Sequence, residues 1–194
     1  MAALFTIGHS NHPIARFIDL LQAHGVAAVA DVRSVPFSRR HPQFSQRALA
    51  DSLDAAGIDY LALGDGLGAR PRDPACVVDG HVDYDRIAAR PAFALALDRV
   101  KAEAASRPIT LMCAEREPLD CHRTVLVCRH LRGAIPAIAH IHGDGAVEPH
   151  AALERRMAEV LGVAPPPLLA DPAAWEAAIE AAYRRKAAEM TGMR

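Results

Sequence analysis

Aromatic residues, charge of one sign and long apolar runs are all scarce in this chain, and each shortage excludes a class of protein. Aromatic residues are 5% of the 194 residues, too few for a broad platform on which single-stranded nucleic acid stacks. The formal net charge of −1 provides no global field to attract nucleic acid or a membrane surface. No apolar run approaches the roughly 20 residues that span a bilayer.

Signals for a disulfide scaffold, for secretion and for a nucleotide loop are absent as well. Four cysteines in a chain of this length do not make a disulfide framework. The first residues lack the basic start and apolar stretch of a signal peptide. Neither G-x-x-x-x-G-K-S/T nor G-x-G-x-x-G occurs, which excludes a P-loop and a standard dinucleotide site. We therefore expect a cytoplasmic protein with four free thiols and no membrane association.

Short apolar segments alternate with helical patterns along the chain. Because such alternation is typical of a parallel sheet covered on both faces, it predicts an α/β fold, a Rossmann-like three-layer sandwich with a mostly parallel five-stranded sheet. Residues 1–163 are expected to form this single domain, and residues 164–194 a linker and a C-terminal helical tail. The five expected strands are "ALFTIG" (3–8), "VAAVADVRS" (26–34), "IDYLAL" (58–63), "PITLMCA" (108–114) and "PAIAHIHGDG" (136–145).

A segment of twenty residues rich in Gly, Pro and Asp, from Gly64 to Asp83, interrupts this alternation. Loops of that length without structure of their own are usually functional lids or mobile segments. After it, a helical pattern covers Tyr84 to Ala105 with an interruption near Pro91.

Polar residues follow four of the expected strands. Right-handed crossovers bring the carboxyl ends of parallel strands to one edge, where open α/β sheets bind ligands. Arginines, hydroxyls and helix N-termini together are the equipment for binding phosphate or another oxyanion. In the alternative interpretation, Asp31 only pairs with Arg33 or Arg123 and holds loops in place. The gathered residues are His9, Ser10, Asn11, Asp31, Arg33, Ser38, Arg39, Arg40, Cys113, Glu115, Cys121, His122 and Arg123.

The expected roles divide this set between catalysis and binding. Glu115, two residues past a buried strand, suits a general base or nucleophile, unless it merely pairs with an arginine. His9 is its natural partner for proton transfer, and His122 orients one of the two. The residues expected to bind substrate are Ser10, Asp31, Arg33, Ser38, Arg39 and Arg123, with Arg123 as the leading anion-binding residue.

Cys113 is an alternative nucleophile, because it lies at a strand end that faces a helix N-terminus. Three carboxylates in the following loop oppose an anionic substrate and raise a thiol pKa. Metal binding by Cys113, Cys121 and a histidine is a lesser alternative, and no cofactor is predicted. Paired C-x-x-C spacing is missing, and adjacent helical residues point about 100° apart, so Cys121 and His122 are not expected to bind one ion.

Five ordered motifs, "TIGHSN", "DVRSVPFSRRHPQF", "LGDGLG", "CAEREPLDCHR" and "HIHGDG", resemble the domain of unknown function 488 family of bacterial and archaeal proteins. The resemblance runs from about Thr6 to Gly145. It implies a compact α/β domain and a cytoplasmic role, but no reaction. The family's signature corresponds here to Gly8, His9, Ser10, Asp31, Arg33, Pro36, Ser38, Arg39, Cys113, Glu115, Cys121, His122 and Arg123.

The favoured function is an enzyme that acts on an anionic, phosphate-bearing substrate, either a nucleotide or part of a nucleic acid, by acid/base hydrolysis or N-glycosidic cleavage. One alternative is a rhodanese- or phosphatase-like thiol enzyme that uses Cys113. Another is a non-catalytic nucleic-acid-binding or regulatory module that acts through "PFSRRHPQF". The oligomeric state is left open.

Overall fold

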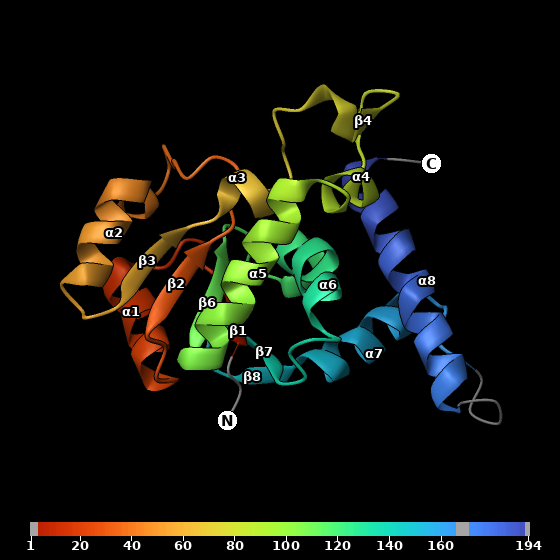
Figure 1. The fold of residues 1–194 in the computed structure, drawn as a ribbon. Coiled ribbons are helices and arrows are strands. Elements are labelled where there is room, and N and C mark those ends of the chain that lie inside the picture. The colour runs from red at the N-terminus through yellow and green to blue at the C-terminus, as the bar shows by residue number, and fades with distance from the viewer. Residues whose placement is uncertain (1–3, 166–170, 193–194) are drawn as a thin grey trace.

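A single six-stranded sheet organises the computed structural model, which describes residues 4–165 and 171–192 (Figure 1). The strand order is β3-β2-β6-β1-β7-β8. Five strands are parallel, and β8 pairs antiparallel with β7. The strands are β1 (Leu4–Gly8), β2 (Ala28–Asp31), β3 (Asp59–Ala62), β6 (Ile109–Cys113), β7 (Ile138–Ile141) and β8 (Val147–Pro149).

The prediction of a mostly parallel α/β sheet is confirmed, but the expected number of five strands is wrong. The sixth strand, β8, follows the turn after β7 and has the sequence Val-Glu-Pro. Such a segment lacks an apolar run and ends in proline, which is confined to edge or terminal positions of strands. It forms because β7 offers it an open edge.

Side chains that alternate along the strands build one apolar core on each face of the sheet. On one face, Ile7 packs with Phe17 of α1 (Ile14–Ala23) and Leu49 of α2 (Gln46–Asp54). Gly25, with a φ of 64°, follows α1 in the left-handed conformation expected of a residue just past a helix end.

On the other face, Leu111 packs with Phe93 of a long helix that crosses in front of the sheet in Figure 1. The elements of this layer are α5 (Pro91–Ser106), a π-helix (Arg123–Cys128) that leads into α6 (Arg129–Leu131), α7 (His150–Val160) and α8 (Pro172–Thr191). The residues of the π-helix are all buried. Short π-helical turns are often found at functional sites.

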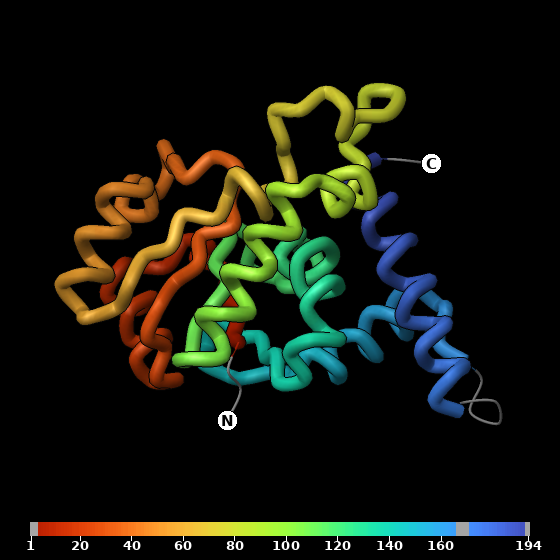
Figure 2. Tube along the Cα trace, viewed as in Figure 1, coloured from red at the N-terminus to blue at the C-terminus, as the bar shows by residue number. Residues whose placement is uncertain are grey.

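The Gly- and Pro-rich segment is not a structureless loop. It forms a chain of short elements that rises from the body of the molecule and returns beside the C-terminal end of α8 (Figure 2). The elements are α3 (Gly64–Leu67), a 3-10 turn (Pro74–Cys76), the hairpin of β4 (Val77–Val78) and β5 (His81–Val82), and α4 (Tyr84–Ala88). The interruption expected near Pro91 separates α4 from α5.

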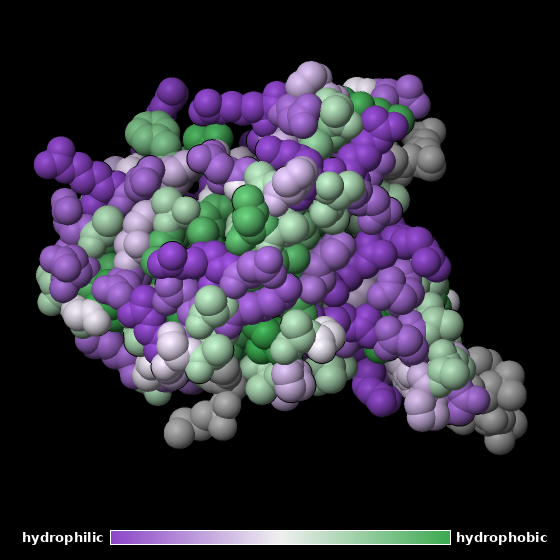
Figure 3. All heavy atoms as spheres, viewed as in Figure 1, coloured by the Kyte–Doolittle hydropathy of each residue, from purple (hydrophilic) through white to green (hydrophobic). Residues whose placement is uncertain are grey.

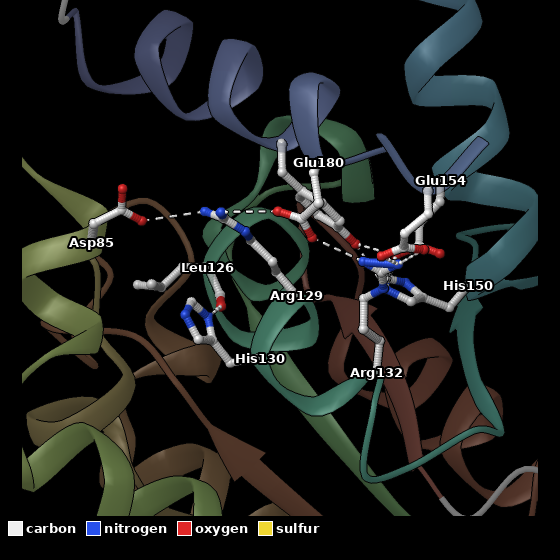
Figure 4. Close-up of polar contacts among 10 residues, drawn as sticks. Asp85, Leu126, Arg129, His130, Arg132, His150, Glu154 and Glu180 are labelled. Atoms are coloured by element: carbon white, nitrogen blue, oxygen red, sulfur yellow. Dashed lines mark hydrogen bonds and ion pairs between the residues drawn. The ribbon is translucent and has the colours of Figure 1, made fainter. Parts of the chain in front are cut away.

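The C-terminal helix α8 packs on the domain through charged and aromatic contacts. Arg132 Nη1 donates to Glu180 Oε1 at 3.0 Å, and Arg132 Nε lies 3.0 Å from Glu154 Oε1, so one guanidinium links α8 to α7 (Figure 4). Arg129 Nη2 binds the same Glu180 carboxylate at 3.2 Å. Tyr183 is fully buried in the same core as α5. Residues 166–170 of the expected linker lie outside the described part of the chain.

The face seen in Figure 3 is mostly hydrophilic, with small hydrophobic areas over the middle of the molecule. Leu95 of α5 is among the exposed apolar side chains. Among the helices of residues 4–165 and 171–192, none is both long and apolar enough to cross a membrane.

Tyr183→Phe tests how α8 is held, because it removes one hydroxyl and keeps the buried ring. Tyr183 Oη donates to Glu154 Oε1 at 2.7 Å and lies 3.0 Å from His150 Nε2. Its loss leaves a buried carboxylate with one donor fewer, which should lower the free energy of unfolding by about 1–2 kcal/mol. Urea unfolding measures the change, and Trp175→Phe on the same helix is the control. Equal stability of Tyr183→Phe and the wild type would contradict this packing.

Candidate functional site

The candidate site lies at the carboxyl end of β6, between β2 and β1. The register pairs Cys113 with Gly8 and Met112 with Asp31, so the residues after all three strands meet at this edge. The chain leaves β1 toward the face covered by α1 and leaves β6 toward the face covered by the π-helix. Adjacent strands whose connections part in this way form a topological switch point, where open α/β sheets bind ligands.

Two glycines of the sequence motifs let the loops of the site approach each other. A Cβ on Gly8 would overlap the carbonyl oxygen of Glu115, and a Cβ on Gly64 would overlap that of Arg33. Both neighbours are backbone atoms, which cannot swing away as a flexible side chain can. Glycine is therefore required at both positions by close packing of backbone on backbone.

Arg33 is held rigidly at this edge by Asp31. Arg33 Nε donates to Asp31 Oδ1 at 2.9 Å and Nη2 donates to Oδ2 at 2.5 Å, and the two side chains are 6% and 1% exposed. Tyr60 Oη donates to the same carboxylate at 2.8 Å. A bidentate pair of this kind orients a guanidinium more strictly than a single contact does. The pairing of Asp31 with Arg33, the alternative weighed from the sequence, is thus present.

His9 supports Arg33 instead of standing free for proton transfer. A guanidinium N–H can only donate, so His9 Nε2 accepts from Arg33 Nη1 at 3.2 Å, and Nδ1 carries the hydrogen bonded to the Ser10 carbonyl at 2.9 Å. The ring also stacks on Phe44 with centroids 4.3 Å apart. Burial, and then the charge of Arg33, lower the pKa of His9 to about 4. These contacts give His9 a positioning role beside Arg33, and its expected acid/base role stays a prediction.

Arg123 is a scaffold residue of the loop after β6. Its side chain is buried, with Nη1 donating to the Glu115 carbonyl at 2.6 Å and Nη2 to the Arg116 carbonyl at 3.2 Å. Its Nε donates to Thr6 Oγ1 at 3.3 Å. The expectation that Arg123 faces the cleft and leads anion binding is wrong, because its guanidinium is directed at backbone carbonyls beneath the loop.

Cys113, Cys121 and His122 form a three-donor cluster, with one donor atom from each lying within 4.8 Å of the others. His122 Nε2 lies 2.9 Å from the Val32 carbonyl, which can only accept, so this nitrogen carries the hydrogen. His122 Nδ1 therefore presents its lone pair to Cys113 Sγ, 3.5 Å away.

The side chains of Cys121 and His122 do not diverge as those of adjacent helical residues do, because Cys121 is not helical. Its φ of −132° and ψ of 138° are extended, and it ends a 3-10 turn (Pro118–Asp120) before the π-helix begins. An extended residue followed by a helical one does not obey the angular spacing of a helix. The two side chains can therefore reach the same point.

The two thiols of the cluster affect each other's ionisation in opposite directions. The hydrogen bond to Cys121, and then burial, raise the pKa of Cys113 well above its usual value. Burial opposes ionisation of Cys121, but the Cys113 thiol, the charge of Arg123 and His122 together lower its pKa well below the usual value. The contacts within the pair therefore favour ionisation of Cys121 over ionisation of Cys113.

A pocket of about 640 Å³ opens in front of the cluster. It unites four residues that the sequence singled out, Arg33, Cys113, Glu115 and His122, and Asp31 lies behind Arg33. Glu115 lines the pocket and is exposed.

Three other residues expected to bind substrate, Ser10, Ser38 and Arg39, do not line this pocket. Ser38 Oγ accepts from the backbone N–H of His41 at 3.0 Å, and Ser10 Oγ donates to Asn11 Oδ1 at 3.3 Å. Ser10 has a φ of 46°, which marks a tight turn after β1. Arg39 is exposed.

The pocket has a wall that sequence reasoning missed. Tyr84, Met190 and Thr191 line it, and the last two belong to the end of α8. Burial, and then the two cluster thiols, raise the pKa of Tyr84 to about 12, so its phenol stays protonated at neutral pH. The position of Tyr84 just after the long Gly- and Pro-rich segment was the one available signal.

The C-terminal end of α8 is tied to this wall at two points. His81 Nδ1 lies 2.9 Å from the Thr191 carbonyl, and Lys186 Nζ lies 2.7 Å from Asp120 Oδ1. These contacts span 110 and 66 residues of sequence, a separation at which local patterns carry no information. The helix expected as a tail therefore closes one side of the pocket.

These features define an α/β protein with a pocket at the switch point of its sheet. Residues 13–129 match the family described as Domain of unknown function DUF488, and because the match covers more than half of the chain, the protein belongs to this family. The matched range contains Arg33, Cys113, Cys121 and His122, whereas His9 precedes it. No curated protein and no solved structure matches the chain.

Arg123→Met should destabilise the fold, because it leaves the Glu115 and Arg116 carbonyls and the buried Thr6 hydroxyl without their donor. The expected loss of unfolding free energy is at least about 2 kcal/mol, measured by urea unfolding. Arg39→Ala, at an exposed position, is the control and should change stability by less than about 0.5 kcal/mol. Equal effects of the two substitutions would show that Arg123 does not hold the loop.

The titration of His9 predicts a pH effect on stability. The pKa of His9 is about 4 in the folded protein and 6.5 without the fold, so between these values the unfolded chain binds more protons. Unfolding free energy therefore falls as the pH drops from about 6.5 to about 4. His9→Gln, which does not titrate, should show a shallower fall, by at most about 3 kcal/mol. Parallel pH profiles for the two proteins would refute this assignment.

Proposed function

We propose that this protein is an enzyme that binds an anionic, phosphate-bearing substrate in the pocket and hydrolyses it. The observation that carries the proposal is the fixed guanidinium of Arg33 in the same pocket as Glu115 and the three-donor cluster. Its contacts with Asp31 and His9 use three of its five N–H groups. Among the described contacts, one N–H on each terminal nitrogen is left for the oxygens of a substrate.

The size and rim of the pocket favour a nucleotide or a part of a nucleic acid. Ligand pockets range from about 300 to 1,000 Å³, and this one has about 640 Å³. The loop after β2 forms part of the rim, where Val35 lines the pocket and Phe37 is 67% exposed. Exposed Arg39 and Arg40 follow Phe37. An aromatic face beside arginines suits a base attached to a phosphate.

We assign the acid/base work to Glu115 and Tyr84, which both line the pocket. In the proposed reaction, water forms a bond to the phosphorus, or to the sugar carbon of an N-glycosidic bond. Glu115 takes a proton from this water, the bond to the leaving group breaks, and the Tyr84 phenol donates a proton to the leaving group. The glutamate then returns its proton to the tyrosine through solvent.

A second candidate is a thiol enzyme, favoured by the 3.5 Å contact between Cys113 Sγ and His122 Nδ1. A histidine with its other nitrogen bonded to a carbonyl is a suitable base for a thiol. The raised pKa of Cys113 opposes this role, because the thiol that faces the pocket is the one that keeps its proton. Rapid labelling of Cys113 by iodoacetamide at neutral pH, ahead of the other cysteines, would favour the thiol enzyme.

A thermal-shift screen of inorganic phosphate, nucleotides and nucleosides tests the proposal. A phosphate compound at about 100 times its dissociation constant should stabilise the wild type by about 2.7 kcal/mol. Arg33→Lys keeps a charge for Asp31 but loses the guanidinium fork, so this stabilisation should disappear. Arg99→Ala, at an exposed position of α5 that does not line the pocket, should retain it.

Glu115→Gln separates catalysis from binding. The variant should bind the same compound with an unchanged thermal shift. It should form product at least about 100-fold more slowly, as expected for loss of a general base. The amount of product formed over time is measured by chromatography. Tight binding with no turnover by the wild type would point to a non-catalytic module. Turnover unaffected by Glu115→Gln would overturn the assigned base.

A further inference from the structure

The three-donor cluster has the composition of a metal site. We propose that Cys113, Cys121 and His122 bind one divalent ion of the zinc type, with a fourth coordination position open to the pocket. The three side chains are 5%, 1% and 8% exposed. In residues 4–165 and 171–192, they are the one group of three or more His, Cys, Asp or Glu side chains whose donor atoms converge this closely.

The donor atoms and their spacing fit tetrahedral zinc. Two thiolates and one imidazole are ligands that zinc prefers, and Zn–S and Zn–N bonds are about 2.3 and 2.0–2.1 Å long. At a tetrahedral angle, these lengths place a sulfur and a nitrogen about 3.6 Å apart. Cys113 Sγ and His122 Nδ1 are 3.5 Å apart, so this pair needs almost no movement to hold the ion.

The hydrogen bond on the far side of His122 prepares it as a ligand. Its Nε2–H donates to the Val32 carbonyl at 2.9 Å, which leaves the Nδ1 lone pair directed at the cluster. Metal-binding histidines almost always donate their second N–H to a carbonyl or carboxylate in this manner. Because Val32 directly precedes Arg33, the same backbone segment orients the histidine and carries the anion-binding side chain.

The backbone path explains how neighbouring residues provide two ligands. Cys113 ends β6, and the chain returns after eight residues to extended Cys121, followed by His122 at the start of the π-helix. Arg123 holds the carbonyls of Glu115 and Arg116 inside this return. The site is therefore built by a closed loop and does not require the paired C-x-x-C spacing of structural zinc sites.

The fourth position faces the pocket. Cys113 and His122 line the pocket together with Arg33, whereas Cys121 lies behind them. Three protein ligands and one open position are typical of catalytic zinc sites, in which the open position takes water or a substrate oxygen. Metal binding does not depend on the proposed hydrolysis, but the binding of a phosphate oxygen at the open position rests on that proposed function.

Metal analysis and cobalt titration of the full-length protein test the site. The purified wild type should contain close to one equivalent of zinc or a similar ion. After the ion is removed with a chelator under reducing conditions, the protein should bind one equivalent of Co²⁺. The expected spectrum has thiolate-to-cobalt charge-transfer bands and the intense visible bands of tetrahedral cobalt.

Matched variants locate the ion. Cys121→Ser and His122→Gln should each weaken Co²⁺ binding at least 10-fold, as should Cys113→Ser. Cys76→Ser, the same substitution at a buried cysteine outside the cluster, should leave the spectrum and the affinity unchanged. Circular dichroism checks that each variant is folded, and the wild-type titration remains decisive if a variant is not.

Several results would overturn the proposal. A wild type that binds less than a tenth of an equivalent of either metal under reducing conditions would do so, as would Cys76→Ser losing as much affinity as Cys121→Ser. Inorganic phosphate added to the cobalt protein tests the open position separately. A change in the visible bands of the wild type supports phosphate binding at the open position. The absence of this change in Arg33→Lys would link the open position to Arg33. An unchanged wild-type spectrum would refute phosphate binding at the ion while leaving the metal site intact.

Discussion

The buried guanidinium of Arg123 is the constraint on which the site depends. A charged group that leaves water is costly unless hydrogen bonds replace its hydration, and here the carbonyls of Glu115 and Arg116 and the Thr6 hydroxyl replace it. The loop after β6 must therefore wrap around this side chain. This wrapping brings Cys121 back beside Cys113, the last residue of β6. It also places the start of the π-helix at the edge of the sheet.

The site contains two buried arginines with different electrostatic consequences. The charge of Arg33 is largely neutralised by Asp31, so Arg33 offers firmly oriented N–H donors more than a net positive potential. Arg123 is bonded to neutral oxygens, and its charge lowers the pKa of both cluster thiols, although other contacts dominate for Cys113. One arginine thus shapes the proposed anion site, and the other favours the thiolate form that either a nucleophile or a metal requires.

Much of the architecture follows from local sequence, but the direction of individual side chains does not. The five parallel strands and the gathering of Arg33, Cys113, Glu115 and His122 at one edge were predicted from apolar runs and from crossover geometry. The contacts of His9 and Arg123 were not predicted, because strand-end position does not reveal whether a side chain points into the pocket or beneath a loop. The prediction that Cys121 and His122 point apart was based on helical spacing, which does not apply because the helix begins after Cys121. The contribution of α8 to the pocket wall depends on contacts between residues that are more than 60 positions apart in the sequence. The periodicity of the sequence does not predict such contacts.

X-ray absorption at the edge of the bound metal tests the central claim, that the strand-end cluster is a chemical centre and more than buried packing. The account predicts a first shell of two sulfur atoms at about 2.3 Å and one or two nitrogen or oxygen atoms at about 2.0–2.1 Å. The spectrum should lose sulfur scattering in Cys121→Ser. A shell made of nitrogen and oxygen alone would place the ion elsewhere and contradict the account.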